Sequence, residues 1–307
     1  MALNDAPSLA DPLRYTPYGG RKKPFAIGLE PLDPKTWIEP DADLEHYLSE
    51  KDRLFESRKD DVFRARADTI DAQREALGFL TDHLTAEHSN VYRRTETGSI
   101  RILQTDRVVD PMDPVRPPLE TAARLVQDDL VLMRRENEAY VLAAAAVCFP
   151  SSWSLAEKFG LPLDAIHEPV PGYAGVMAER MRRIFDRLSS DQIVWRTNWS
   201  IYDTAALPAF RNSEQFSGLW QDRNFDKAFI RVERQTLRRL PESGDLLFTI
   251  RIYLDPMERL QCHPERARLA AGLRTQLLAL DADQLSYKAL TVHRDSLAKY
   301  LEELASR

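Results

Sequence analysis

Cysteine is nearly absent from this chain of 307 residues, which contains only Cys148 and Cys262. Two cysteines are too few for a disulfide framework, a four-thiolate metal site or an iron–sulfur cluster. Long apolar runs are missing too, since the longest one, residues 140–150, is far shorter than the ~20 residues that a membrane-spanning helix needs. The first residues contain no basic segment followed by an apolar one, so we expect a cytoplasmic protein.

Several enzyme signatures are also absent. Only 11 glycines occur, and they form neither a phosphate-binding loop nor a nucleotide-binding fingerprint. The motifs His-Glu-x-x-His and Gly-x-Ser-x-Gly are missing, and the segment Cys262-His263-Pro264 is typical of a structural loop. A formal net charge of −6 argues against binding to nucleic acid or to an anionic membrane. Hydrolases and general polyanion binders are therefore disfavoured.

Hydrophobic periodicity predicts an α+β fold in three parts. Residues 1–90 form a proline-rich arm and two or three amphipathic helices, residues 91–260 form a core with an antiparallel sheet, and residues 261–307 form helices that pack on this core. The core is expected to contain, in chain order, a hairpin at 91–104, a helix at 119–135, a strand at 140–149, a helix at 175–188 and strands at 193–202, 229–240 and 245–254. The last two strands are joined by a Pro-Glu-Ser-Gly turn, which predicts an antiparallel hairpin.

His167 stands between an apolar stretch and a turn that is held by prolines. The apolar residues before it recur at spacings of four, four and three, which predicts one helical face made of Leu155, Phe159, Leu163 and Ile166. Gly160 and Pro162 must interrupt any continuous helix there. After His167, Pro169 and Pro171 restrict the backbone, so the imidazole is expected to be held at one angle.

Two interpretations of His167 follow. A neutral imidazole is a common ligand of iron or zinc, and the iron of a haem is often held by a single histidine. Because no Cys-x-x-Cys-His sequence is present, such a haem would be bound without a covalent link. Alternatively, His167 packs beside the core with its hydrogen bonds satisfied. Spacing alone favours this second interpretation, because a lone histidine on an apolar face is a weak signal.

Successive side chains of a strand point to opposite faces, which sorts the polar residues of the three long strands into sets. The sets are Arg196, Asn198 and Ser200 on the first strand, Arg231, Glu233 and Gln235 on the second, and Thr249, Arg251 and Tyr253 on the third. One side of the sheet could hold a polar pocket that faces His167. Arg231, Glu233 and Arg251 could equally form cross-strand ion pairs on a solvent face.

Residues 179–239 contain twelve arginines and lysines against eight acids, although the whole chain is acidic. Arginine binds carboxylates through two parallel hydrogen bonds, and the propionates of a haem are carboxylates. The candidate propionate ligands are Arg182, Arg183, Arg196, Arg223 and Arg231. The same basic region could instead dock an acidic partner subunit.

Five ordered strings in the chain resemble signatures of the haem-dependent oxidative N-demethylase alpha-subunit family. They are LVQDDLVLM, VCFPSSWSLAEKFGLPLDAIHEPVPGY, RTNWSIYD, RVERQTLRRLPESGDLLFTIRIYL and SYKAL, and the resemblance runs through most of the chain. It implies a PAS-like antiparallel sheet that carries non-covalent haem b and is elaborated with N-terminal and C-terminal helices. The iron ligand that it implies is His167, on the helical segment before the last three strands.

The resemblance also implies an activity. Proteins of this family remove a methyl group from a small secondary amine such as dimethylamine, and they use O2 to form the primary amine and formaldehyde. Electrons would come from a partner reductase subunit with NADPH, FMN and an iron–sulfur cluster, whose signatures this chain lacks. The last strands would supply the catalytic residues Glu233, Arg231, Asn198 and Tyr253, with Thr249 as a further haem contact. Glu233, or the ring of Trp199 or Tyr253, could orient the substrate cation.

Two other classes of protein stay open. A haem PAS domain can bind a gas and signal to a partner without turnover, although no kinase, cyclase or DNA-binding element is recognisable here. A PAS-like structural subunit without haem would leave His167 buried and without a metal. Amine-dependent consumption of O2 separates the enzyme from both.

Overall fold

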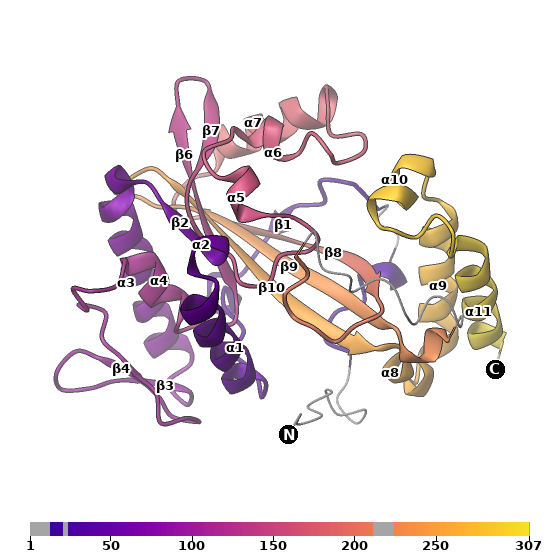
Figure 1. The fold of residues 1–307 in the computed structure, drawn as a ribbon, viewed down its shortest axis with the longest axis horizontal. Coiled ribbons are helices and arrows are strands. Elements are labelled where there is room, and N and C mark those ends of the chain that lie inside the picture. Colours follow the sequence, from indigo (N-terminus) through magenta and orange to yellow (C-terminus); the bar gives the residue numbers. More distant parts are fainter. Residues whose placement is uncertain (1–12, 21–23, 211–223, 307) are drawn as a thin grey trace.

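The computed structural model of the chain describes residues 13–20, 24–210 and 224–306 (Figure 1). One antiparallel sheet of seven strands runs through the middle of the molecule, and helices pack on both of its faces (Figure 1). The strands, in their order across the sheet, are β1 (Glu30–Pro31), β8 (Ile193–Tyr202), β9 (Phe229–Arg239), β10 (Leu246–Pro256), β6 (Asp129–Glu136), β7 (Ala139–Ala146) and β2 (Phe63–Ala65). The predicted α+β class is confirmed.

Strands β8, β9 and β10 are the long strands that alternation predicts, and each lies within two residues of its expected bounds. β9 and β10 pair along their whole length. In the turn between them, the Leu240 amide donates to the Asp245 carbonyl over 2.9 Å, and Gly244 has a φ of +75°. A positive φ favours glycine, so the sequence of this turn suits the hairpin that it predicts.

The two faces of the sheet carry different helices. Helices α5 (Leu155–Lys158), α6 (Leu163–Ile166) and α7 (Val176–Arg187) connect β7 to β8 and pack on the face that includes Val131 and Leu237. The C-terminal helices pack on the opposite face, against Trp199 and Val232 of β8 and β9. They are α8 (Met257–Cys262), α9 (Arg266–Leu278), α10 (Ala282–Tyr287) and α11 (Arg294–Ser306).

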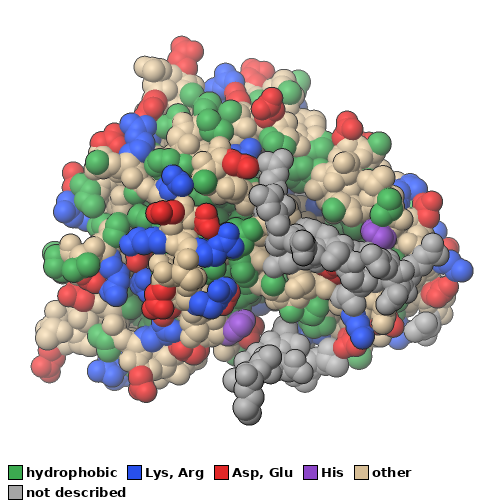
Figure 2. Space-filling model, in the orientation of Figure 1, with side chains coloured by type: hydrophobic (Ala, Val, Ile, Leu, Met, Phe, Trp, Pro, Cys, Tyr) green, Lys and Arg blue, Asp and Glu red, His purple; other side chains and the backbone are tan. Residues whose placement is uncertain are grey.

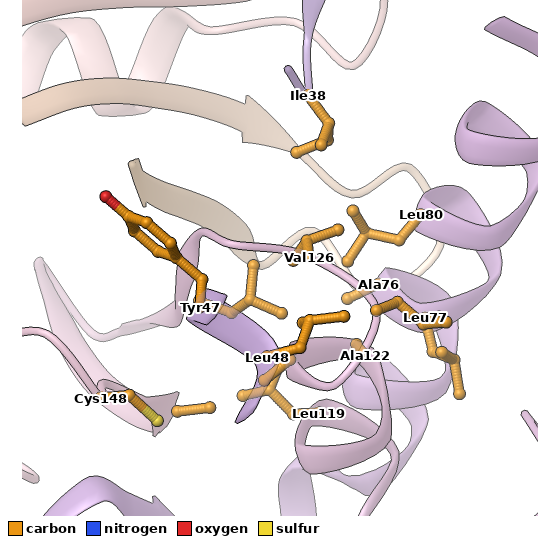
Figure 3. Packing of buried hydrophobic residues seen from close by; sticks show 14 of the residues in the cluster. Ile38, Tyr47, Leu48, Ala76, Leu77, Leu80, Leu119, Ala122, Val126 and Cys148 are labelled. Atoms are coloured by element: carbon orange, nitrogen blue, oxygen red, sulfur yellow. The ribbon is translucent and has the colours of Figure 1, made fainter. Parts of the chain in front are cut away.

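The N-terminal helices form their own packed group beside the sheet (Figure 1). They are α1 (Leu44–Ser57), α2 (Lys59–Val62), α3 (Ile70–Glu87) and the short α4 (Pro118–Ala123). In Figure 3, Leu48 of α1 and Leu77 of α3 lie in one cluster with Leu119 and Ala122 of α4, and all four are buried. The predicted amphipathic helices of residues 41–90 are confirmed, and their apolar sides close this cluster.

The predicted helix at 119–135 is wrong. Only its first turn is helical, as α4, and residues 129–136 form β6, which pairs with β10 on one side and β7 on the other. Leu130 to Met133 are all buried because β6 lies inside the sheet and is covered on both faces. A continuous apolar run of this kind suits a buried strand as well as a helix, so periodicity could not separate them. The strand β2, inside the expected helical region, was also missed.

The predicted hairpin at 91–104 is confirmed, but it belongs to a separate sheet of three strands, β3 (Tyr92–Arg94), β4 (Ile100–Ile102) and β5 (Val108–Val109). Four short 3-10 helices complete the described chain: η1 (Pro17–Gly19), η2 (Pro34–Thr36), η3 (Ala67–Thr69) and η4 (Phe225–Lys227). Within the described ranges, every helix is too short or too polar to cross a bilayer.

Candidate functional site

His167 directly follows α6, and its ring is held on two sides. Its Nδ1 lies 2.9 Å from the carbonyl oxygen of Leu163, and its ring stacks on Tyr173 with centroids 4.7 Å apart and planes at 18°. A carbonyl only accepts, so Nδ1 carries the proton in this hydrogen bond and Nε2 keeps its lone pair. Metal-binding histidines are usually oriented by such a second hydrogen bond. The geometry therefore suits a ligand that coordinates through Nε2.

The surroundings also keep this imidazole neutral. Burial lowers the pKa of His167, and the positive charge of Arg196 lowers it further, against the opposing effect of the hydrogen bond to Leu163. A neutral imidazole is the form that binds a metal.

The turn after His167 is fixed by local contacts. The Val170 amide donates to the His167 carbonyl over 2.8 Å, and the Tyr173 hydroxyl donates to Asp164 over 3.1 Å. Asp164 also forms an ion pair of 3.1 Å with Arg182. The expectation of a firmly held imidazole is borne out by these contacts.

The strand register shows which polar residues share the face that α5 to α7 cover. Asn198 lies opposite Glu233, and Arg196 lies opposite Gln235, so their side chains project from the same side as Val194 and Leu237. This is the side that packs on the α5–α7 segment. We call it the His167 face, because α6, which directly precedes His167, packs on it through Leu163.

Arg196 has unused hydrogen-bonding capacity. Its Nε is buried and has no hydrogen-bond partner among the described residues. Burial lowers the pKa of Arg196, and the negative charge of Glu233 opposes this effect. The Nε atoms of Arg234 and Arg251 are also buried without a partner, but these two arginines donate through their terminal nitrogens. Arg196 is therefore a candidate for binding a carboxylate or another acceptor.

Glu233 is the negative group of this cluster. Its Oε2 accepts a hydrogen bond of 2.9 Å from Gln235, its neighbour on the same face. Its charge also acts on Lys288 and on Tyr287, which come from the C-terminal part of the chain.

Arg231 shares the His167 face, but its donors are already used. It donates to Ser151 Oγ over 3.0 Å and to the carbonyl oxygens of Leu207 and Phe149, each over 2.8 Å. These bonds tie the segment after β7 to the centre of the sheet. Arg231 is thereby placed as a structural anchor beside the candidate site.

Two of the predicted site residues lie on the other side of the sheet. Thr249 is opposite Thr236 in the register, and their hydroxyls are 2.8 Å apart beneath Trp37, whose Nε1 donates to Thr236. The Tyr253 hydroxyl donates to Glu39 over 2.7 Å. We call this side the Trp37 face. The structure therefore does not bring Thr249 and Tyr253 together with Arg196 and Glu233.

The predicted arginines of α7 are exposed and form ion pairs at the surface. Arg182 pairs with Asp164, and Arg183 pairs with Glu179 over 3.2 Å. Charges of both signs are interspersed over the face in Figure 2. Arg223, the remaining candidate for a propionate, lies outside the described residues.

A surface cleft of about 290 Å³ is lined by residues of the turn between β6 and β7, of α6 and of α7. Its lining includes Glu136, Tyr140, Asp164 and Arg182, but neither His167 nor any residue of β8 or β9. The free Nε2 of His167 and the unpaired Arg196 are the stronger chemical signals, so we place the candidate site between α6 and the sheet.

Lys288 is a buried basic residue near Trp199 of β8, on the side of the C-terminal helices, and the sequence analysis missed it. It is buried, its ammonium donates to the carbonyl oxygen of Trp199, and it lies 4.9 Å and 5.1 Å from the ring centroids of Trp199 and Phe25. Burial lowers its pKa to about 8, and Arg196 lowers it further against the effect of Glu233. No spacing rule connects Lys288 to β8, although it lies within the string SYKAL.

The candidate site thus combines a single histidine, whose Nδ1 is held by a carbonyl, with a face of the sheet that carries Glu233 and the unpaired Nε of Arg196. A single protein ligand with nearby carboxylate-binding groups is typical of a haem protein. The family model described as haem-dependent oxidative N-demethylase, alpha subunit-like, matches residues 28–298. The chain belongs to this family, and the resemblance seen in its sequence is confirmed.

Proposed function

We propose that this chain is the haem-carrying subunit of an enzyme that demethylates a small secondary amine such as dimethylamine. The amine, O2, two electrons and two protons give the primary amine, formaldehyde and water. Family membership supports the haem-dependent oxidative chemistry. The observation that carries the assignment to a site is the His167 hydrogen bond to Leu163, which leaves Nε2 free to coordinate.

The arrangement of the strands supports a PAS-like core. Strands β7, β6, β10, β9 and β8 are neighbours in that order, and α5 to α7 lie between β7 and β8 in the chain. In a PAS-like domain the cofactor lies between such helices and the sheet. This arrangement supports the proposal that the haem would lie on the His167 face of the sheet.

His167 and Arg196 would hold the haem. Nε2 of His167 would bind the iron, and the guanidinium of Arg196 would pair with a propionate, which its unpaired Nε suits. Bound haem supplies an iron centre that accepts electrons and activates O2. The packing of Tyr173 on the imidazole keeps the ligand in one orientation.

Glu233 would act on the amine. A secondary amine carries a proton at neutral pH, and its nitrogen must lose that proton before the lone pair is available. A carboxylate can hold the ammonium by a charge-assisted hydrogen bond and accept the proton. Asn198, directly across the strand pair, would add an amide that orients the same nitrogen.

The electrons would come from another subunit. The description of the family as alpha subunit-like supports an assembly with further chains. We propose a partner with NADPH, FMN and an iron–sulfur cluster, since the two cysteines of this chain are Cys148, which is buried, and Cys262. Cytoplasmic location is part of the same proposal, because NADPH is produced there.

Turnover tests the proposal. The haem-loaded protein is supplied with an NADPH-dependent flavoprotein reductase and dimethylamine, and O2 consumption and formaldehyde are measured together. We expect one formaldehyde for each O2 consumed in the presence of amine. Glu233→Gln should lower kcat by about 10²-fold or more, because general acid–base groups contribute at least that much. A haem protein that binds CO but consumes no O2 with any small secondary amine would support the gas-binding alternative.

A further inference from the structure

Four residues around the turn after α6 form a closed ring of contacts. The carbonyl of Leu163 accepts the hydrogen bond from Nδ1 of His167, and the His167 ring stacks on Tyr173. The Tyr173 hydroxyl donates to Oδ1 of Asp164 over 3.1 Å. Asp164 directly follows Leu163 in the chain, so the path returns to the residue where it began. Two adjacent residues of α6 therefore hold the two stacked rings, each by one hydrogen bond.

The two contacts of the imidazole supply different restraints. The hydrogen bond to Leu163 fixes the direction of Nδ1, but the torsion that turns a histidine ring about its Cβ–Cγ bond has broad energy minima. A stacked aromatic neighbour restrains the plane of the ring. The planes of His167 and Tyr173 differ by only 18°. The plane of the imidazole therefore depends on how Tyr173 holds its own ring.

Tyr173 is held at both ends. Its amide donates to the carbonyl of Val170 over 3.1 Å, and its carbonyl accepts from the amide of Ala178 over 2.9 Å. These bonds fix the backbone from which the buried side chain projects. The hydroxyl at the far end of the ring is held by Asp164, whose carboxylate can only accept. Asp164 is thus the polar contact that sets the direction of the Tyr173 ring.

The second oxygen of Asp164 has a partner of its own. Oδ2 pairs with Arg182 of α7 over 3.1 Å, and both side chains of this ion pair are about half exposed. Ion pairs in such surroundings contribute little to stability. Arg182 can therefore be replaced without removing the hydrogen bond between Asp164 and Tyr173.

We propose that Asp164 is a positioning residue for His167 and that it acts through Tyr173. Its carboxylate holds the phenol ring against the imidazole, and the stacked ring keeps Nε2 in the one direction that a ligand of this histidine needs. The part of the inference that concerns haem rests on the proposed function. The ring of four contacts belongs to the protein itself and can be measured without haem.

Nitrogen-15 NMR of the histidine side chains tests the role in the haem-free protein. We expect His167 to carry its proton on Nδ1, and this proton can exchange with water only when the imidazole turns away from Leu163. Because the stack resists that turn, Asp164→Ala and Tyr173→Phe should each speed the exchange about three- to tenfold. Asp164→Asn keeps an oxygen that accepts from the hydroxyl, so its exchange rate should stay within about twofold of the wild type.

Two further variants separate this role from a general effect of charge or folding. Arg182→Met removes the exposed partner of Asp164 and should leave the exchange unchanged. In a Tyr173→Phe background, Asp164→Ala should have no additional effect, because Asp164 acts through the hydroxyl. The midpoint of thermal unfolding is measured for every variant, so that a loss of folding is recognised.

Haemin titration then extends the test to the ligand. The dissociation constant should rise about three- to tenfold in Asp164→Ala and Tyr173→Phe, and Asp164→Asn should restore it to nearly the wild-type value.

The outcomes are distinct. Equal exchange rates in the wild type, Asp164→Ala and Tyr173→Phe would overturn the role of Asp164, whatever the protein binds. An effect that Arg182→Met reproduces, or that Asp164→Asn does not rescue, would also contradict it. The predicted exchange rates in a wild-type protein that binds no haemin would support the role of Asp164 and overturn the proposed function.

Discussion

Both faces of the central sheet carry buried charged residues, but they use them differently. On the Trp37 face, Arg251 donates to Asp41 over 2.8 Å and packs on the ring of Tyr47, while Arg234 donates to the carbonyls of Thr36 and Trp37. On the His167 face, the buried Nε of Arg196 has no hydrogen-bond partner among the described residues. The Nε atoms of Arg234 and Arg251 share this property, but their terminal nitrogens are paired. We infer that the arginines of the Trp37 face stabilise the fold and that Arg196 is available to bind a ligand.

The difference also explains why residue type alone is a poor guide to function. Arg231, Arg234 and Arg251 are each about 1% exposed, and their donors go to backbone carbonyls or to a carboxylate. They fasten the N-terminal segment and the loop after β7 to the sheet. A buried arginine with these partners is part of the structure, whatever the function of the protein.

The largest effect should follow from breaking the ion pair on the Trp37 face. Arg251→Met removes the buried partner of Asp41, whose carboxylate is partly exposed, and breaking a fully buried pair typically costs about 3–5 kcal/mol, which is the upper limit here. We expect the free energy of unfolding in urea to fall by this order. Arg74→Met, an exposed arginine of α3, should change it little. A similar small change in both variants would contradict a structural role for Arg251.

The matching substitution on the His167 face should act on ligand binding. Arg196→Met removes a half-buried guanidinium whose Nε has no partner among the described residues, so we expect little loss of stability in the haem-free protein. Its affinity for haemin should fall about tenfold or more, since a hydrogen bond to a charged group is worth about 1.5–3 kcal/mol. Haemin titration of Arg196→Met against the exposed Arg183→Met measures this. Equal affinities would remove Arg196 from the haem site.

Acid should weaken the packing around Trp37. Burial, with the charges of His88 and Arg238, lowers the pKa of His83 to about 4, from a usual value near 6.5. The unfolded chain protonates His83 at a higher pH than the folded chain does. The contribution of neutral His83 to the free energy of unfolding is therefore present above pH 6.5 and is lost towards pH 4. In His83→Gln, the free energy of unfolding should fall less between pH 6.5 and pH 4 than in the wild type. The exposed His46→Gln should leave it unchanged.

The smallest effect is expected for Thr249→Val. The substitution keeps the shape of the side chain and removes its hydrogen bond to Thr236, which still has Trp37 as a partner. Stability should fall by about 1 kcal/mol. Haemin affinity should not change, because Thr249 is on the Trp37 face. A weakened haem complex would show that this face also contributes to the site.

Sequence reasoning succeeds here where a local pattern is sufficient. Alternation predicts β8, β9 and β10, the turn around Gly244 predicts their hairpin, and the prolines after His167 predict a fixed imidazole. The family strings point to His167 before any contact is known. These features depend on neighbours in the chain.

Sequence reasoning fails where contacts between segments that are far apart in the chain determine the structure. The face that Thr249 shares with Thr236 is set by the register of β9 with β10, which alternation within one strand does not give. β6 is buried on both faces, so its sequence is a continuous apolar run that periodicity cannot distinguish from a helix. Lys288 contacts Trp199 across 89 residues of the chain, and the sequence gives no sign of this contact.

The central claim is that His167 is the iron ligand of a haem site on its face of the sheet. We would titrate the haem-free protein with haemin and record the visible spectrum, oxidised and then reduced under carbon monoxide, for the wild type, His167→Ala and the control His46→Ala. The account predicts stoichiometric binding with a Soret band that shifts with carbon monoxide in the wild type and in His46→Ala. In His167→Ala the band should be lost or altered. Identical spectra for all three proteins, or no haemin binding by the wild type, would contradict it.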